Sequence, residues 1–275
     1  MSSYRAHGVK PPRSLQKAVG KALVDYQQIQ ANDKILLGLS GGKDSLSLLH
    51  LLLHFQRHAP IDFTLGVVTI DPQAEDFDPS SLIPYVESLG LDYHYIREPI
   101  VDIATEHMTN DSFCAFCSRM KRGLMYKTAR EQGYNVIALG QHLDDLAESF
   151  LMSAFRGGRL ETMKAHYVID AGDLRVIRPL VYARERQTAD FATMAKLPVI
   201  KDNCPACFSK PTEREHTKQL LRNEEQRNPH LYQNLLRTMQ PLIAKGLPKE
   251  ASDLLNHAPH NNKLSDDQHS HSNAA

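Results

Sequence analysis

One short segment carries most of the residues that could bind a phosphate. Residues 40–45 read Ser-Gly-Gly-Lys-Asp-Ser and lie between an apolar run and a leucine-rich stretch. The two glycines let backbone N–H groups turn towards an anion, the start of a following helix adds its dipole, and Lys43 adds a positive charge. An aspartate beside phosphates is repulsive unless a divalent cation bridges them, so Asp44 predicts bound Mg²⁺. The spacing fits neither GxxxxGK[ST] nor GxGxxG.

The four cysteines form a second group of candidate residues, and they occur as two CxxC pairs. The pairs are Cys114 with Cys117 and Cys204 with Cys207. Because residues 1–16 contain no apolar block typical of a secretion signal, we do not expect a disulfide scaffold. Thiolates bind zinc and iron–sulfur clusters alike, and a CxxC pair also suits a sulfur relay because its thiol pKa is lowered. The spacing leaves these alternatives open.

Three further carboxylates follow predicted strands. Asp71 ends the run Val-Val-Thr-Ile, and Asp144 and Asp145 come shortly after Gly140 at the end of another run. The carboxyl ends of parallel strands face one crevice, so these groups are expected near the segment 40–45. Adjacent carboxylates repel unless a cation lies between them. The alternative for all three is a capping role at the N-terminus of a helix.

A regular alternation of elements positions these residues. Apolar runs predict strands at 34–39, 63–70, 93–96, 136–139 and 176–181, and stretches with helical spacing occur at 43–57, 80–89, 118–132, 142–155 and 185–195. This alternation predicts an α/β fold with a doubly wound, mainly parallel sheet. A basic helix with Ser14 as its N-cap precedes the sheet, and helices broken near Asn228-Pro229 follow it between Glu213 and Lys245.

Composition and charge exclude several classes of protein. The chain has 275 residues and 41% hydrophobic residues, which is enough for a sizeable core. No apolar run approaches the ~20 residues of a membrane span, so we expect a cytoplasmic protein with no membrane partner. Lys and Arg number 32, as do Asp and Glu, so net charge identifies no partner. Bases gather locally, however, and those at the centre of the chain are candidates for RNA contact: Arg119, Lys121 and Arg122.

The order of these motifs resembles the TtcA family of PP-loop ATP pyrophosphatases. The motifs are SGGKDS, a CxxC followed by Ser-Arg-Met-Lys-Arg-Gly, a GxxxDD segment, Ile177-Arg178-Pro179-Leu180 and a second CxxC, and the resemblance runs from about Lys17 to Ile243. It implies an adenine nucleotide alpha-hydrolase-like fold and ATP-dependent thiolation of a tRNA cytidine to 2-thiocytidine, expected in the anticodon loop. ATP would adenylate the C2 oxygen, and sulfur delivered through a 4Fe-4S cluster would replace it.

The resemblance also implies roles for particular residues. The expected catalytic residues are Lys43, Asp44, Asp144 and Asp145. The expected ATP-binding residues are Ser40, Gly41, Gly42, Lys43, Asp44, Ser45, Asp71 and Gly140, with Asp44 on Mg²⁺. The cluster would be held by three cysteines: Cys114, Cys117 and one of the later pair, with Cys207 favoured over Cys204. Gln141 stands where the family pattern has a histidine, which puts the role of that histidine in doubt here.

Two other functions fit part of the sequence. One is a PP-loop enzyme that thiolates a uridine or amidates a small molecule, with a structural zinc site. The other is a nucleotide- or RNA-binding adaptor without turnover, against which the intact Lys43, Asp44 and Asp145 argue. The expected partners of the thiolase are tRNA, ATP and a sulfur donor such as a cysteine desulfurase, and self-association as a homodimer remains open.

The chain is expected to divide into four segments. Residues 1–31 form a basic helical segment, and 32–200 form the PP-loop ATP-binding α/β domain with the first CxxC. Residues 201–247 form a helical segment with the second CxxC. Residues 248–275 are polar and rich in His, Asn, Ser and Asp, which is typical of a disordered tail.

Overall fold

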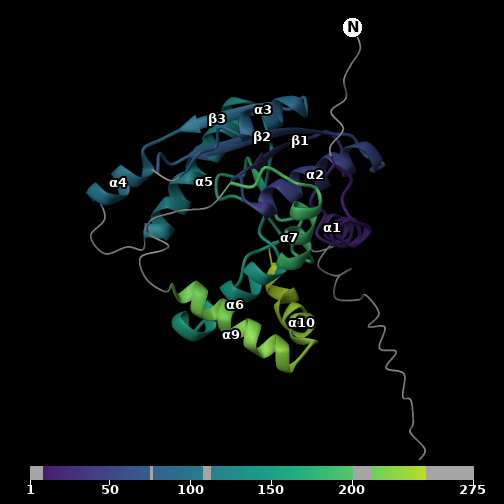
Figure 1. The fold of residues 1–275 in the computed structure, drawn as a ribbon, viewed down its shortest axis with the longest axis vertical. Coiled ribbons are helices and arrows are strands. Elements are labelled where there is room, and N and C mark those ends of the chain that lie inside the picture. The colour runs from purple at the N-terminus through teal and green to yellow at the C-terminus, as the bar shows by residue number, and fades with distance from the viewer. Residues whose placement is uncertain (1–8, 75–76, 108–112, 201–211, 246–275) are drawn as a thin grey trace, which may run out of the picture.

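Within the residues that the structure describes, six strands form one sheet (Figure 1). The structure is a computed structural model and describes residues 9–74, 77–107, 113–200 and 212–245. The order across the sheet is β3-β2-β1-β4-β6-β5. The strands are β1 (Asp33–Gly38), β2 (Phe63–Asp71), β3 (Asp92–Arg97), β4 (Val136–Ala138), β5 (His166–Val168) and β6 (Arg175–Ile177).

The sheet is parallel except at one edge, where β5 runs antiparallel to β6. The central strand β1 pairs with β2 on one side and β4 on the other, so that Ile35 lies opposite both Leu65 and Val136. A strand covered on both faces must be apolar throughout, which is why β1 and β2 are nearly continuous runs of buried residues. The predicted doubly wound, mainly parallel α/β fold is therefore confirmed.

Helices cover both faces of the sheet. Residues of α1 (Arg13–Asp25), α2 (Lys43–His58), α3 (Leu82–Ser88) and α7 (Glu185–Met194) share one buried apolar cluster with β1 and β2. Residues of α4 (Ile100–His107) and α5 (Phe113–Glu131) share another with the opposite side of the same strands. In a parallel α/β unit each helix runs opposite to the strand that follows it, so α5 begins at the carboxyl edge of the sheet.

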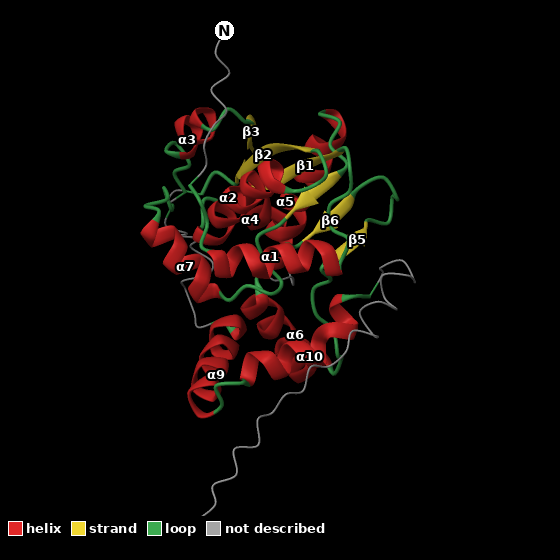
Figure 2. Cartoon of the chain, turned by 90° about the vertical axis from the view of Figure 1, so that its right-hand side faces the viewer, coloured by secondary structure: helices red, strands yellow, loops and turns green. Residues whose placement is uncertain are grey.

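A third cluster joins the C-terminal helices to the rest of the molecule. α6 (Leu143–Gly157), α9 (Glu213–Arg227) and α10 (Leu231–Ile243) lie together beyond the sheet, as Figures 1 and 2 both show. Their buried residues pack with Ala22 and Tyr26, while Leu15 and Val19 of the same N-terminal segment belong to the first cluster. The N-terminal segment therefore contacts both the helices that cover the sheet and the C-terminal helices. The predicted break near Asn228-Pro229 is confirmed, because α9 ends at Arg227.

The ends of two helices differ from the sequence expectation. α5 begins at Phe113 rather than at Ser118, so the first CxxC lies in its first turns. α1 begins one residue before Ser14, with Pro12 in the N-cap position. A proline suits the start of a helix because its φ is fixed and it has no N–H to leave unpaired.

Two strands also differ. β6 ends at Ile177 instead of Val181, since Pro179 lacks the N–H that a ladder needs. The three-residue strand β5 and the short helix α4 were not expected. β5 alternates too briefly to be recognised in sequence and exists through its pairing with β6. Among the described helices, none combines the length and apolar character needed to cross a membrane.

The buried His50 predicts a pH-dependent stability. It is fully buried on α2, its Nδ1 accepts the backbone N–H of Val9 at 3.0 Å, and its Nε2 contacts the hydroxyl of Tyr85. Burial, aided by Arg57, lowers the pKa of His50 to about 4 from 6.5. Between these values the unfolded chain binds a proton that the folded chain does not. The stability that the protein gains from keeping His50 neutral is therefore fully present above pH 6.5. About 3 kcal/mol of the free energy of unfolding is lost as the pH falls to about 4.

Urea unfolding at a series of pH values checks this expectation. His50→Gln should flatten the dependence between pH 6.5 and 4, whereas His216→Gln, at an exposed position on α9, should leave it unchanged. Parallel curves for wild type and His50→Gln would contradict the assignment.

Candidate active site

The segment 40–45 connects β1 to α2, as the sequence predicts, and no side chain caps the start of that helix. Gly41 has φ +83, and a Cβ there would lie 2.6 Å from Cδ1 of Ile200, so a side chain is excluded on both grounds. Gly42 is the N-cap of α2 and makes no side-chain capping bond. N–H groups in the first turn of a helix have no intrahelical partner, so this turn can bind an anion.

Two serine hydroxyls shape the loop. Oγ of Ser40 lies 3.1 Å from Oγ of Ser45, which in turn donates to the carbonyl oxygen of Gly42 at 3.0 Å. The backbone N–H of Gly42 points to Oγ of Ser40 at 3.3 Å. These contacts close the turn on itself and preorganise it. Their role in binding ATP stays a prediction.

Lys43 and Asp44 lie side by side at the start of α2. Nζ of Lys43 contacts Asp44 Oδ2 at 3.0 Å and Glu185 Oε1 at 3.1 Å. Burial lowers the pKa of Lys43, but the charges of Asp44 and Glu185 outweigh burial and raise it above 10.5. The hydroxyl of Thr188 donates to Asp44, and Nε2 of His142 lies 3.7 Å from Oδ2 of Asp44. The first turn of α7 therefore holds both charged residues of the loop.

The segment after β4 packs directly against this loop. A Cβ on Gly140 would lie 3.2 Å from the backbone nitrogen of Ser45. His142 is the N-cap of α6 in a reciprocal capping box: its Nδ1 accepts the N–H of Asp145 at 3.3 Å, and the carboxylate of Asp145 accepts the N–H of His142 at 2.9 Å. The capping alternative considered for Asp145 is thus present in the structure.

The adjacent carboxylates Asp144 and Asp145 each pair with an arginine that comes from another part of the chain. Asp144 binds Arg184 at 3.0 Å and accepts the backbone N–H of Glu185 at 2.7 Å. Asp145 pairs with Arg214 of α9. Cationic groups do neutralise the pair, as repulsion requires, but they belong to the protein. A catalytic role for Asp144 and Asp145 remains a prediction.

Gln141, the departure from the family pattern, has a structural partner. Its Oε1 accepts Nε of Arg178 at 2.9 Å, and Nη1 of the same guanidinium donates to the carbonyl of Lys164 at 2.7 Å. Arg178 is buried, which lowers the pKa of its guanidinium. Gln141 therefore stabilises a buried arginine, and the histidine beside it, His142, faces Asp44 instead.

Asp71 ends β2 at the same edge of the sheet. It is buried, its Oδ2 accepts the hydroxyl of Tyr95, and its Oδ1 accepts the N–H of Gln73 at 2.8 Å. Nε of Arg97 lies 3.7 Å away. The carboxylate caps a turn rather than a helix, and its predicted contact with ATP is not tested by this geometry.

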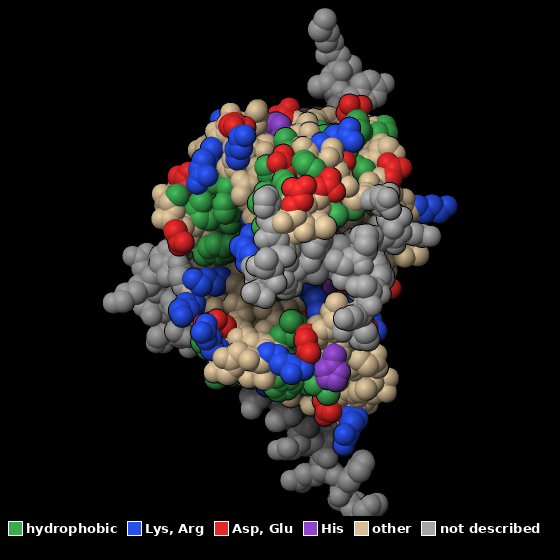
Figure 3. Space-filling model, turned by 90° about the vertical axis from the view of Figure 1, so that its left-hand side faces the viewer, with side chains coloured by type: hydrophobic (Ala, Val, Ile, Leu, Met, Phe, Trp, Pro, Cys, Tyr) green, Lys and Arg blue, Asp and Glu red, His purple; other side chains and the backbone are tan. Residues whose placement is uncertain are grey.

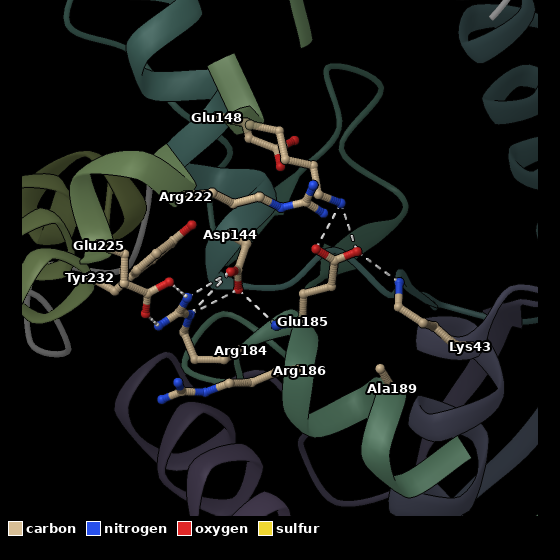
Figure 4. A pocket seen from close by; sticks show the side chains of 11 residues that line it. Lys43, Asp144, Glu148, Arg184, Glu185, Arg186, Ala189, Arg222, Glu225 and Tyr232 are labelled. Atoms are coloured by element: carbon tan, nitrogen blue, oxygen red, sulfur yellow. Dashed lines mark hydrogen bonds and ion pairs between the residues drawn. The ribbon is translucent and has the colours of Figure 1, made fainter. Parts of the chain in front are cut away.

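A cavity of about 270 Å³ opens beside Lys43. It lies between the first turns of α2, α6 and α7 on one side and α9 and α10 on the other (Figure 4). Figure 3 shows a hollow between the sheet with its covering helices and the group formed by α6, α9 and α10, with Lys and Arg side chains on its rim. The lining residues are Lys43, Asp144, Glu148, Arg184, Glu185, Arg186, Ala189, Lys218, Arg222, Glu225 and Tyr232.

The carboxylate Glu185 connects the two sides of this cavity. Besides Lys43, it binds Nζ of Lys218 on α9 at 2.8 Å. Burial would raise the pKa of Glu185, but Lys218 and Lys43 lower it to about 2, so it is ionised at neutral pH. Sequence reasoning missed Glu185, Thr188 and Lys218. Each looks like an ordinary residue on a helix, and no local pattern marks them.

The cysteines are only partly described. Cys114 and Cys117 lie one turn apart in the first turns of α5, and Cys117 is half-buried against the apolar cluster of that face. They therefore lie at the carboxyl edge of the sheet, as do the segment 40–45 and Gly140. Cys117 does not line the cavity beside Lys43. Cys204 and Cys207, the two candidates for a third ligand, lie outside the described residues, as does the polar tail 248–275.

The predicted RNA-binding bases lie on α5. Arg119 and Arg122 are exposed and Lys121 is partly exposed. Arg130, further along the same helix, is held by Asp173 through two hydrogen bonds of 2.6 and 3.1 Å. Contact of Arg119, Lys121 and Arg122 with RNA stays a prediction.

Gly140→Ala should impair the loop without removing a charge. The new methyl group would press on the backbone at Ser45 and Asp44, so we expect a loss of about 1–3 kcal/mol, the usual cost of overpacking. Thermal unfolding and the KM for ATP measure it. Gly157→Ala is the matched control, because a Cβ there meets nothing within 4 Å. Equal KM values in the two variants would contradict the role assigned to this contact.

Comparison with known proteins gives a consistent result. Residues 12–224 match the model of the PP-loop domain family. The chain is 41% identical to the tRNA-cytidine(32) 2-sulfurtransferase of Pelobacter propionicus, over 82% of this chain and 85% of that protein. It is 37% identical to the protein of that name from Geobacter sulfurreducens, over 82% and 89%, and 36% identical to that from Vibrio vulnificus, over 86% and 77%.

Among solved structures, the chain resembles the U34-tRNA thiolase NcsA from Methanococcus maripaludis, determined with its 4Fe-4S cluster. The TM-score is 0.67 at 21% identity, covering 89% of this chain and 88% of that one. At this level of identity the likeness shows a shared fold.

Proposed function

Because the chain belongs to the tRNA-cytidine(32) 2-sulfurtransferase family of PP-loop proteins, we propose that it uses ATP to replace the C2 oxygen of cytidine 32 in tRNA with sulfur. The observation that carries the proposal is the meeting of two kinds of group at one edge of the sheet. The first turn of α2, which no side chain caps, lies there with Lys43 and Asp44, and so does the start of α5 with its two cysteines.

The first half of the reaction belongs to the loop. The N–H groups at the start of α2 and the ammonium of Lys43 bind the pyrophosphate part of ATP, which neutralises the charge that develops as the bond between the α and β phosphates breaks. The C2 oxygen of cytosine attacks the α phosphate and becomes an adenylate ester. This ester leaves readily as AMP, whereas the original oxygen does not.

Asp44 fits a magnesium site. Mg²⁺ commonly takes one or two carboxylates together with substrate phosphates, and Asp44 is the carboxylate beside the loop. In the described part of the chain no group of three or more His, Cys, Asp or Glu is arranged to hold a metal without such help. Asp44 would hold Mg²⁺, which would supply positive charge beside the phosphates. Thr188 and Lys43 hold the carboxylate in place for it.

The cysteines of α5 fit an iron–sulfur cluster by donor type. Soft thiolates are its usual ligands, and the first turns of a helix favour the charged thiolate form. Cys114, Cys117 and one cysteine of the later pair, with Cys207 favoured, would hold a 4Fe-4S cluster. When bound, the cluster would deliver sulfur from the donor to replace the activated oxygen. The protein's own task is then to keep water away from the adenylate until sulfur arrives.

Nucleoside analysis of tRNA tests the proposal. Cells lacking this chain should lose 2-thiocytidine, and purified protein given ATP, a sulfur donor and tRNA should form it with release of AMP and pyrophosphate. Metal analysis after anaerobic purification should find iron. Unchanged 2-thiocytidine would contradict the proposal, and loss of a thiouridine, or an active zinc protein acting on a small molecule, would support the alternatives.

A further inference from the structure

The cavity beside Lys43 is lined by many charged residues to which the proposed reaction with ATP gives no role. Five of its lining residues are basic and four are acidic, and they come from α2, α6, α7 and α9 or immediately precede α7. Figure 4 shows that these side chains surround a shared space between the loop and the C-terminal helices. What the cavity can bind depends on which of these charges remain available.

Every carboxylate of the cavity already has a cationic partner. Burial raises the pKa of Glu148, although its bond to Arg214 opposes this effect. The ion pairs are Asp144 and Glu225 with Arg184, Glu185 with Lys43 and Lys218, and Glu148 with Arg214. Among the described residues that line the cavity, no carboxylate is left without a cationic partner to attract a cationic ligand.

Two arginines that line the cavity are not bound to any of these carboxylates. Arg186 and Arg222 are exposed, and neither forms an ion pair within 4.0 Å of any residue that the structure describes. Arg184 is the cation that binds Glu225 and lowers the pKa of this carboxylate, and the charge of Arg186 also helps to lower it. Figure 4 places them on opposite sides of the cavity, with the side chain of Arg222 extending towards Glu185. The cavity therefore presents two available guanidinium groups to an anion, one on α7 and one on α9.

An RNA strand fits this arrangement better than a single small anion. A guanidinium offers planar, paired N–H donors that match a phosphate, and two such groups on opposite walls suit successive phosphates of one strand. We propose that Arg186 and Arg222 bind phosphodiester groups of the substrate tRNA on either side of the cavity beside Lys43. This inference rests on the proposed function, and it adds an RNA contact separate from the bases of α5.

The test measures tRNA affinity rather than thiolation. Filter binding uses an unmodified tRNA transcript that contains cytidine 32, at several salt concentrations, with wild type, Arg186→Gln, Arg222→Gln and the double variant. Each single change should raise Kd about tenfold, since a hydrogen bond to a charged group is worth that much. Each should also make the negative slope of the logarithm of the association constant against the logarithm of the salt concentration shallower by about one.

A matched variant and a second ligand separate the possible sources of phosphate. Arg227→Gln, at another exposed arginine of α9 that does not line the cavity, should bind tRNA like wild type. The KM for ATP should stay within about twofold in all variants, as should the thermal unfolding temperature. A raised KM for ATP with unchanged tRNA affinity would overturn the inference and assign the cavity to nucleotide phosphates.

Failure of the inference differs from failure of the proposed function. If the double variant binds tRNA as tightly as wild type, or if Arg227→Gln weakens binding equally, the inference is wrong even where wild type thiolates tRNA. If wild type forms no 2-thiocytidine, the proposed function is wrong, and the loss of tRNA affinity in the double variant would still stand as a measurement of the cavity.

Discussion

Asp44→Asn is expected to lower the rate of tRNA thiolation by about a thousandfold, the loss that follows when one group aimed at transition-state charge is removed. The change keeps the volume of the side chain and leaves an oxygen that can accept the hydroxyl of Thr188. It removes the negative charge that would hold Mg²⁺ against the phosphates. Pyrophosphate release in the presence of tRNA measures the adenylation step directly.

Iron content is the second readout for this variant. The loop lies at the start of α2 and the first CxxC lies at the start of α5, so the variant should keep its iron. Asp173→Asn, a change of the same kind in an exposed ion pair with Arg130, should alter neither rate nor iron. Loss of iron in Asp44→Asn would contradict the separation of an ATP site from a sulfur site.

Cys117→Ser is expected to show the opposite pattern. The variant should lose most of its iron and thiolate tRNA at least about a hundredfold more slowly, because even residues that only support metal ligands cost 10- to 100-fold. It should still bind ATP, since Cys117 lies on the face of the sheet covered by α4 and α5, whereas Lys43 and the start of α2 lie on the other. Anaerobic iron and sulfide analysis, with ATP binding measured separately, checks both halves.

A sulfur-containing neighbour provides the control. Met120→Leu replaces a partly buried thioether one turn further along α5 and should retain both iron and activity. Normal thiolation by Cys117→Ser would show that the cluster assignment is wrong. Loss of ATP binding in that variant would instead mean that the two sites are not separate.

The order of elements could be predicted because it depends on local patterns. Runs of apolar residues at β1 and β2 can be buried only in a sheet covered on both faces, and the glycines at 41 and 42 mark the turn that follows. The alternation of such runs with leucine-rich helices leaves few topologies other than a doubly wound sheet. The strand β5 escaped because its sequence, His-Tyr-Val, is not an apolar run, unlike the runs that marked the equally short β4 and β6.

The CxxC and SGGKDS motifs were equally visible in the sequence, since their chemistry lies in neighbouring residues. Their spacing predicted a phosphate-binding turn at a helix start and a pair of thiolates. The spacing did not predict where α5 begins. Its start at Phe113 brings Cys114 and Cys117 into a helix. The role of Gln141 also could not be predicted, because its partner Arg178 lies far along the chain, directly after β6.

The residue types and their order along the chain determined the fold class, the glycine-containing turn 40–45 and the candidate thiolate ligands, because each depends on neighbours in sequence. Folding alone decided that Glu185 lies between Lys43 and Lys218 and that Arg184 neutralises Asp144. These ion pairs join α2, α6, α7 and α9, segments far apart in the chain. A charge acquires its partner, and a cavity its free arginines, only when packing of the apolar clusters brings such segments together.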